Sequence, residues 1–146
     1  MEIVVKNFDE LSIYELYDLL QLRTEIFVVE QDCVYQDLDG KDSKALHIIG
    51  KKEGKIVAYT RCFEPGIYFE EASIGRVVVQ FEQRKYGYGH HIMQASIKAI
   101  KNHYHTEIIK ISAQTYLRKF YESHGFKKIG AGYLEDGIPH IAMIKN

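Results

Sequence analysis

The stretch from Val77 to His90, VVVQFEQRKYGYGH, constrains the fold most, because an apolar strand, a polar turn and a glycine-rich helix start follow one another within it. A helix leaves its first backbone N–H groups without partners inside the helix, and its aligned peptide dipoles place about half a positive charge at that end. Gly87 and Gly89 lack Cβ atoms, so the backbone can aim several N–H groups at one anion and a bulky pyrophosphate can come close. The stretch therefore predicts a binding loop for a phosphate-bearing ligand.

Length and composition place the chain among ordinary globular domains. A chain of 146 residues is expected to form one domain, residues 1–146, with a full hydrophobic core. Apolar residues make up 46% and charged residues 27%, which argues against disorder. Nineteen Lys and Arg residues against twenty Asp and Glu residues give a net charge of −1, so no overall basic field exists to hold nucleic acid.

Cysteine usage and hydropathy bear on the compartment. Cys33 and Cys62 stand in no CxxC or other metal-ligand spacing, and both are expected to be reduced thiols. No uninterrupted apolar segment reaches the roughly 18 residues that a membrane span needs, and the N-terminus does not read as a signal peptide. We expect no membrane partner and a cytoplasmic location.

The order of expected elements predicts a mixed α/β domain. Ser12 followed by Glu15 is a capping box, and apolar residues at spacings of three and four predict a helix from there to about Val28. Further helices are expected over 89–103 and 115–124, and strands over 2–8, 47–51, 56–63, 72–79, 107–113, 127–131 and 140–145. Early hairpins joined to later strand–helix–strand units predict a mixed sheet with helices packed on it.

Several polar clusters resemble metal sites without meeting their requirements. Asp37, Asp39 and Asp42 lie in an irregular loop but lack the residue order and the terminal Glu of a calcium loop, and we interpret them as solvated turn acids. His103 and His105 end a predicted helix, where the helix dipole favours imidazoles without any metal. No metal is predicted.

Spacing separates the glycine-rich loops that bind phosphates. A P-loop needs GxxxxGK[ST], which is absent. The dinucleotide fingerprint needs a third Gly, but Ile92 stands at that position, and seven residues separate Val79 from Gly87 where a tight turn is required. Both nucleotide-binding loops are therefore disfavoured.

Two ordered blocks instead resemble the GNAT superfamily of acetyl-CoA-dependent N-acetyltransferases. Residues 84–89, RKYGYG, fit the [RQ]xxGx[GA] pattern that follows a valine-rich strand, and residues 120–126, FYESHGF, are similar to the superfamily's FYxxxGF segment. FVVEQ at 27–31, GRVVV at 75–79 and EDGIPHI at 135–141 narrow the resemblance to the ElaA-like subfamily. Lys85 and Gln114 depart from the pattern, since Gly and Asn are common there in relatives.

The resemblance implies a single-domain GNAT fold, with a central mixed, largely antiparallel sheet and helices on both faces. Acetyl-CoA would lie where two strands splay apart, its pantetheine amides paired with the backbone at Val77 and Val79 and its pyrophosphate held by N–H groups from Lys85 to His90. The cofactor-binding residues implied are Val77, Val78, Val79, Arg84, Lys85, Tyr86, Gly87, Tyr88, Gly89, His90 and Gln114.

The resemblance also implies the chemistry. Tyr121 matches the usual proton donor to the departing thiolate, and a phenol can serve because it stays neutral at pH 7. Glu30 and His140 are candidates for the general base or the acceptor site, while the Glu base of some families cannot be transferred because Ile109 stands there.

The acceptor is expected to be a small-molecule or peptide amine bound by the loops 29–44 and 133–139. A homodimer through the C-terminal strands is common among relatives. The alternative reading is a non-catalytic module that binds acyl-CoA and has lost turnover.

Overall fold

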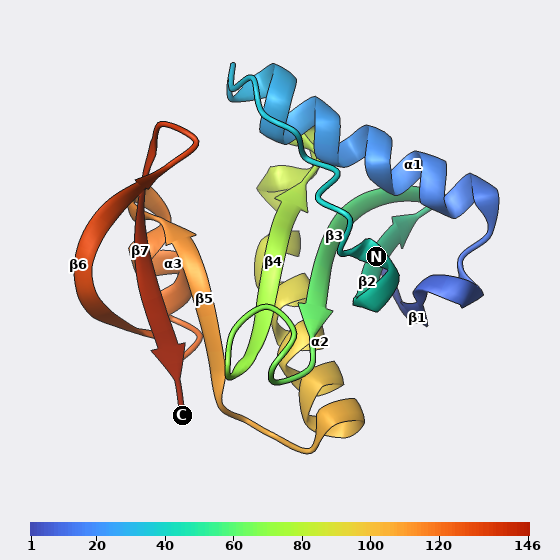
Figure 1. Ribbon diagram of the computed structural model, residues 1–146. Helices are drawn as coiled ribbons and strands as arrows, with labels where there is room; N and C mark the ends of the chain where they lie inside the picture. The colour runs from blue at the N-terminus through green and yellow to red at the C-terminus, as the bar shows by residue number, and fades with distance from the viewer.

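One seven-stranded sheet organises the computed structural model, which describes all residues from Met1 to Asn146 (Figure 1). The strands lie in the order β1-β2-β3-β4-β5-β7-β6, and only β4 and β5 pair in parallel. Their bounds are β1 Glu2–Asn7, β2 Leu46–Lys52, β3 Lys55–Phe63, β4 Ala72–Val79, β5 Ile109–Gln114, β6 Lys127–Glu135 and β7 Ile138–Lys145. The expected mixed, largely antiparallel sheet is confirmed.

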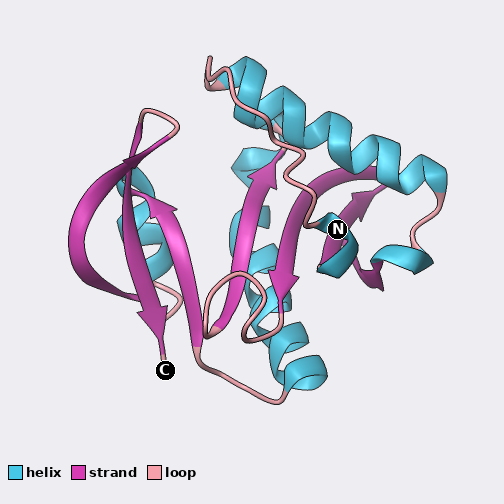
Figure 2. Ribbon diagram, in the orientation of Figure 1, coloured by secondary structure: helices cyan, strands magenta, loops and turns pink.

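Helices cover both faces of the sheet (Figures 1 and 2). The α-helices are α1 Ile13–Thr24, α2 Tyr88–Tyr104 and α3 Arg118–Glu122, and the short turns are η1 Phe8–Glu10, η2 Glu25–Glu30, η3 Asp42–Lys44, η4 Phe81–Tyr86 and η5 Thr115–Leu117. The expected single-domain α/β architecture with helices on both faces of the sheet is confirmed.

No helix has the length and apolar character needed to cross a membrane.

Alternating side chains of the sheet divide the core into two layers. Ile49 and Tyr59 pack under α1, whereas their neighbours Ile48 and Ala58 belong to the larger cluster under α2 and α3. Successive residues of a strand point to opposite faces, so the two helical layers lie on opposite sides of the sheet. Each layer buries one apolar stripe of its helices, which is what the spacing of apolar residues predicts.

The start of α1 confirms the predicted capping box. The Ser12 Oγ accepts the N–H of Glu15 at 3.0 Å, and the Glu15 carboxylate accepts the N–H of Ser12 at 2.9 Å. The α-helix ends at Thr24 rather than near Val28, and the chain continues as a π-turn to Glu30. The wider turn arises because N–H groups reach five residues back instead of four.

The C-terminal part differs from the expected bounds. The predicted helix over 115–124 is divided into η5 and α3, and the last hairpin runs longer than expected on both strands. Asp136 and Gly137 both adopt left-handed φ, at 51° and 77°, which is the geometry of a two-residue hairpin turn. The ladder therefore continues to Glu135 and Ile138, and it brings the residues next to the turn into the sheet.

The acids of the loop after α1 are buried, so their interpretation as solvated turn acids is wrong. Asp37 and Asp42 are 6% and 7% exposed, and both pair with Arg23, which is fully buried on α1. Asp42 also pairs with the buried Arg61 of β3 at 3.0 Å, and Asp39 binds the same guanidinium. The acids tolerate burial because three arginines pair with them: Arg23 and Arg61 donate hydrogen bonds to their carboxylates, and Arg76 of β4 forms an ion pair with Asp37 and donates to its backbone carbonyl.

The arginines set the protonation of these acids. Burial by itself would raise the pKa of Asp39, but the hydrogen bonds and the charge of Arg61 outweigh it and hold that pKa well below its usual range. At Asp42, burial by itself would likewise raise the pKa, but the hydrogen bonds and charges of Arg23 and Arg61 outweigh it, and the pKa is lowered. Three cations and three anions thus fasten the loop to α1, β3 and β4.

Replacing Arg23 with Met should destabilise the fold strongly. Removing one partner of a buried ion pair leaves uncompensated charge, and the expected loss in the free energy of unfolding is about 3–5 kcal/mol. Urea denaturation followed by circular dichroism measures it. Lys101→Met is the matched control, because its pair with Glu107 is 62% and 61% exposed, and it should cost less than about 1 kcal/mol. Equal losses in the two variants would contradict the role given to this buried network.

Stability should also fall in acid. The carboxyl groups of Asp39 and Asp42 have depressed pKa values in the folded protein, so the unfolded chain binds more protons once the pH drops below the ordinary range of aspartate. The stabilisation they contribute is present above about pH 4 and is lost as the pH falls toward their folded-state values. Urea midpoints measured from pH 7 to pH 3 should be flat at first and then decline; midpoints that rise on acidification would contradict this.

Candidate functional site

The sheet splits between β4 and β5, and this split creates the candidate site. The two strands pair only at Ala72 with Ile109 and at Ser73 with Lys110. Beyond those pairs β4 continues to Val79 and β5 to Gln114 without a ladder between them, and the widening gap is visible in Figure 1. Backbone N–H and C=O groups in the middle of a sheet require partners, so the split offers an extended ligand a place to hydrogen-bond.

A bulge in β4 bends the strand at the split. On β3 one residue separates Tyr59 from Arg61, whereas on β4 two residues separate the corresponding Val78 and Gly75. Arg76 lies in the bulge with a left-handed φ of 50°, a conformation that costs energy for a residue with a side chain. The Arg76 guanidinium anchors this conformation by pairing with Asp37 at 2.8 Å.

The start of α2, where the sequence predicts a phosphate-binding loop, lies at the mouth of the split. Gly87 is the N-cap, with φ 71° and ψ 20°, so the predicted need for a glycine there is met. A Cβ on Gly89 would lie 3.4 Å from the ring of Phe120, an ordinary contact distance, so α2 and α3 meet at this position. The N–H groups of His90 and His91 both bond to the Gly87 carbonyl, so the N–H groups that the helix leaves without an internal partner are those before His90.

Arg84 and Glu30 form an ion pair beside this mouth. The guanidinium donates to both carboxylate oxygens, at 2.8 and 3.1 Å, and its Nε donates to the carbonyl of Val79 at 3.1 Å. Glu30 is therefore tied, through Arg84, to the end of β4 and to the turn that precedes α2. The Val79 oxygen is already engaged in this contact.

A cavity of about 470 Å³ connects the start of α2 with the interior of the split. Most of the residues predicted for the site line it together: Glu30, Val77, Val78, Val79, Arg84, Gly87, Gly89, His90, Gln114, Tyr121 and His140. Lys85, Tyr86 and Tyr88 lie outside the lining, and the ammonium of Lys52 sits 4.1 Å over the ring of Tyr86.

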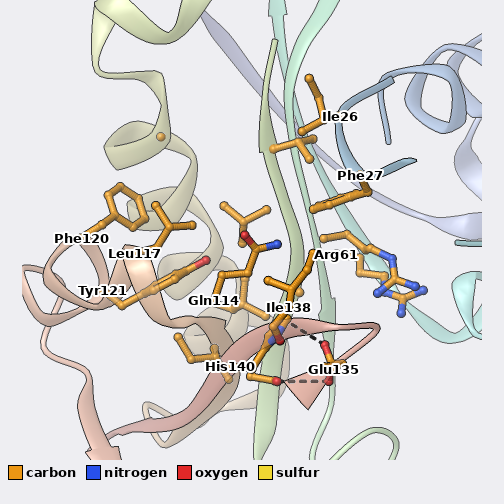
Figure 3. A pocket seen from close by; sticks show the side chains of 18 of the residues that line it. Ile26, Phe27, Arg61, Gln114, Leu117, Phe120, Tyr121, Glu135, Ile138 and His140 are labelled. Carbon is orange, nitrogen blue, oxygen red and sulfur yellow. Dashed lines mark hydrogen bonds and ion pairs between the residues drawn. The ribbon is translucent and has the colours of Figure 1, made fainter. Parts of the chain in front are cut away.

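Tyr121 stands in the wall of this cavity. Its ring is buried at 6% exposure between Phe120 and Phe126, and its hydroxyl points toward the centre of the cavity (Figure 3). Burial raises the pKa of the Tyr121 phenol far above its ordinary value. The group is therefore a neutral hydrogen-bond donor over the whole physiological pH range.

His140 lies on β7 at the other end of the cavity. Its Nδ1 is 2.7 Å from the carbonyl oxygen of Ile138, which can only accept, so Nδ1 carries a proton. Its Nε2 is 3.3 Å from the carboxylate of Glu135, and Figure 3 shows the two side chains facing each other. Ser112 of β5 donates to the other carboxylate oxygen of Glu135 at 3.2 Å.

Two contacts bridge the split on the side of the loop that follows η2. The side-chain amides of Gln31 and Gln114 form a reciprocal pair at 3.1 and 3.2 Å. The Cys33 thiol donates to the Asp136 carbonyl at 3.3 Å, which joins the loop to the last hairpin. Gln114 is thus held from across the split.

Sequence reasoning missed Gln31, Ser112 and Glu135 as residues of the site. Gln31 and Glu135 were visible only as parts of family-like segments, and nothing in the spacing paired them with Gln114 or His140. A signal did exist for Glu135: the Asp-Gly turn predicts a two-residue hairpin, which places residues 135 and 138 opposite each other and His140 close by.

Comparison with known proteins agrees with this geometry. A family profile described as an acetyltransferase (GNAT) domain matches residues 15–146. The chain is 41% identical to protein ElaA of Escherichia coli over 141 residues, which cover 95% of this chain and 92% of that protein. It is also 41% identical to a UPF0039 protein of Schizosaccharomyces pombe over 145 residues, covering 98% and 95% of the two chains.

Solved structures give the same result. The crystal structure of E. coli ElaA superposes with a TM-score of 0.91 at 38% identity over 100% of both chains. That of an acyl-CoA N-acyltransferase from Pseudomonas aeruginosa superposes with a TM-score of 0.94 at 38% identity, again over 100% of both chains. The sheet split, the glycine-rich start of α2 and these similarities agree, and the chain belongs to the GNAT acetyltransferase family as an ElaA-like member.

Proposed function

We propose that this protein transfers the acetyl group of acetyl-CoA to a primary amine by direct attack of the amine on the thioester. The observation that carries the proposal is the continuity of one cavity, from the glycine-rich start of α2 along the unpaired part of β4 to Tyr121. The similar P. aeruginosa protein is described as an acyl-CoA N-acyltransferase, which supports an acyl-CoA as the donor.

The cofactor would occupy the split in an extended form. Its pyrophosphate would take hydrogen bonds from the first N–H groups of α2, where the helix dipole favours an anion. A pantetheine arm carries amide donors and acceptors like those of a peptide strand, so it can pair with the backbone of β4 at Val77. The Val79 oxygen already accepts from Arg84, so the arm would use the groups of β4 that lie deeper in the split.

The acetyl group would then lie between Tyr121 and the acceptor end of the cavity. The amine nitrogen forms a bond to the carbonyl carbon, the C–S bond breaks, and Tyr121 gives its proton to the departing sulfur. The nitrogen loses a proton as the amide forms, and that proton restores the phenol. Burial keeps the Tyr121 phenol protonated, so a donor faces the sulfur while the C–S bond breaks, and the proton released by the nitrogen offsets the transfer by returning the phenol to its neutral form.

His140 is the better candidate for the base among the two that the sequence suggests. Its Nδ1–H is fixed by the Ile138 carbonyl, which leaves Nε2 as the nitrogen that accepts a proton. Glu30 is instead paired with Arg84 at the anion site, and its carboxylate holds the loop that would bind the pyrophosphate. We therefore assign Glu30 to positioning the cofactor loop.

Cofactor binding can be tested by comparing two glycine variants of the same backbone geometry. Gly87 and Gly54 have φ of 71° and 79°, and a Cβ on either would meet no atom within 4 Å. Each change to Ala should therefore cost about 1 kcal/mol of folding stability through the strained φ. Only Gly87→Ala should weaken acetyl-CoA, by about tenfold or more, in isothermal titration calorimetry.

Two results would count against the cofactor assignment. Wild-type protein that binds no acetyl-CoA at millimolar concentration would refute it outright. Equal affinity in the Gly87→Ala and Gly54→Ala variants would show that the start of α2 is not the phosphate site. Free-CoA release with a panel of primary amines then separates an enzyme from a non-catalytic acyl-CoA-binding module, because only the enzyme exceeds the rate of simple hydrolysis.

Tyr121→Phe should lower kcat by roughly 100-fold with little change in acetyl-CoA affinity, because the ring still packs and only the proton donor is lost. Tyr104→Phe is the control, since this tyrosine of α2 lies outside the cavity and should leave kcat unchanged. Because burial raises the pKa of Tyr121, the wild-type rate should not decline between pH 8 and pH 10 through loss of this proton. An unchanged kcat in Tyr121→Phe would show that Tyr121 only packs in the wall of the cavity and does not donate a proton.

A further inference from the structure

We propose that Glu135 binds the acceptor amine as an ammonium ion and that His140 then removes its proton, so that the protein selects alkylamines over amines that are neutral in water. This inference rests on the proposed function and specifies the class of its acceptor. It assigns a role to Glu135, a residue of β6 that the family-like motifs do not mark as functional.

The orientation of His140 directs its proton-accepting nitrogen at Glu135. The Nδ1–H donates to the Ile138 carbonyl at 2.7 Å, and the ring stacks on Tyr133 with centroids 6.2 Å apart and planes 21° apart. These contacts leave Nε2 directed at the Glu135 carboxylate, 3.3 Å away (Figure 3). A proton passed to Nε2 would therefore lie beside this carboxylate.

Glu135 is held in place while it remains open to the cavity. Ser112 Oγ donates to its Oε1 at 3.2 Å, and the Ser112 hydroxyl also hydrogen-bonds that of Tyr133. The Glu135 side chain is 45% exposed, whereas that of His140 is 8% exposed. An ammonium ion arriving from solvent therefore meets the carboxylate first, and it can then pass a proton to the imidazole behind it.

The charges around the acceptor end favour a cation. The arginines that line the cavity are already neutralised, Arg61 and Arg76 by the aspartates of the loop and Arg84 by Glu30. Glu135 and Asp136 are the carboxylates at this end that have no Lys or Arg partner. The Cys33 thiol bonds to the Asp136 carbonyl and the Tyr133 phenol to Ser112, so the neighbours named at this end add no positive charge of their own.

The reach of the Glu135 charge is visible at a second element. Tyr68, in the connection between β3 and β4, also lines the cavity. Burial first, and then the Glu135 carboxylate, raise the pKa of its phenol, whereas the charges of Arg76 and Arg61 oppose that rise. Tyr68 therefore lies within reach of the Glu135 charge, and its ring offers a surface to the body of an amine.

The proton transfer balances without any further reagent. One N–H bond of the ammonium breaks, its electron pair stays on nitrogen, and the proton binds Nε2 of His140. The neutral nitrogen then attacks the thioester carbon, and His140 later returns its proton to solvent past the exposed Glu135. An arylamine is neutral at pH 7 and skips the first step, so it gains nothing from either residue.

The test measures binding, and so it needs no turnover. Benzylamine, a cation at pH 7, and aniline, a neutral amine of similar shape, are titrated by calorimetry into the protein alone and into the protein saturated with CoA. Glu135→Gln keeps the size of the side chain and its hydrogen bond from Ser112 while removing the charge. Asp136→Asn removes the same charge from the same turn and controls for the general field.

The wild-type protein should bind benzylamine, and Glu135→Gln should weaken that binding about tenfold or more, as expected for a charge-assisted hydrogen bond. Asp136→Asn should weaken it by no more than about threefold, and aniline affinity should change less than twofold in either variant. Equal effects of the two variants, an equal loss of aniline binding, or no benzylamine binding by the wild type would each overturn the proposal. Loss of CoA binding by Glu135→Gln would also overturn it, whereas a wild type that fails to bind CoA refutes the proposed function instead.

If the protein acetylates both amines, the rates provide a second test of the role of Glu135. Glu135→Gln should raise KM for benzylamine and shift the pH profile of its kcat/KM, whereas the profile for aniline stays in place. A purely structural role for Glu135 would lower both rates alike and would leave both pH profiles where they are.

Discussion

The parting of β4 and β5 is the constraint on which the rest of the structure depends. A sheet that loses its ladder after Ser73 leaves backbone donors and acceptors without partners in the middle of the molecule, where they are costly unless something hydrogen-bonds them. The missing ladder between β4 and β5 creates the candidate site, because the start of α2, the wall formed by α3 and the end of the last hairpin all meet at the gap. An extended ligand with amide groups can pair with the unpaired backbone of β4 along its length, which a compact ligand cannot do.

Keeping the strands apart requires a rigid frame, and the buried arginines and aspartates provide it. The bulge at Arg76 lies where β4 parts from β5, and its strained φ is held by the pair with Asp37, which Arg23 of α1 holds in turn. The same loop carries Gln31 and Cys33 across the gap to β5 and to the last hairpin. Stability and the shape of the cavity therefore depend on the same contacts.

Features that are local in sequence could be predicted, and features that arise from long-range pairing could not. The capping box of Ser12 and the left-handed Gly87 follow from residues a few positions apart. The two family-like blocks predict the fold and single out Tyr121 as a residue of the site. The burial of Asp37 depends on Arg23 and Arg76, which lie far from it in sequence, so the acids of that loop looked solvated. The Glu135 contact with His140 was missed for a different reason: the Asp136–Gly137 turn signals it, but the expected strands stopped short of that turn.

The central claim is that the unpaired part of β4 holds the arm of an acyl-CoA, and amide hydrogen exchange followed by NMR tests it most directly. On addition of acetyl-CoA, the amides of β4 beyond Ser73 should become more protected, while those of β1, at the far edge of the sheet, should not change. Acetyl-CoA that binds without any added protection in β4 would contradict the account.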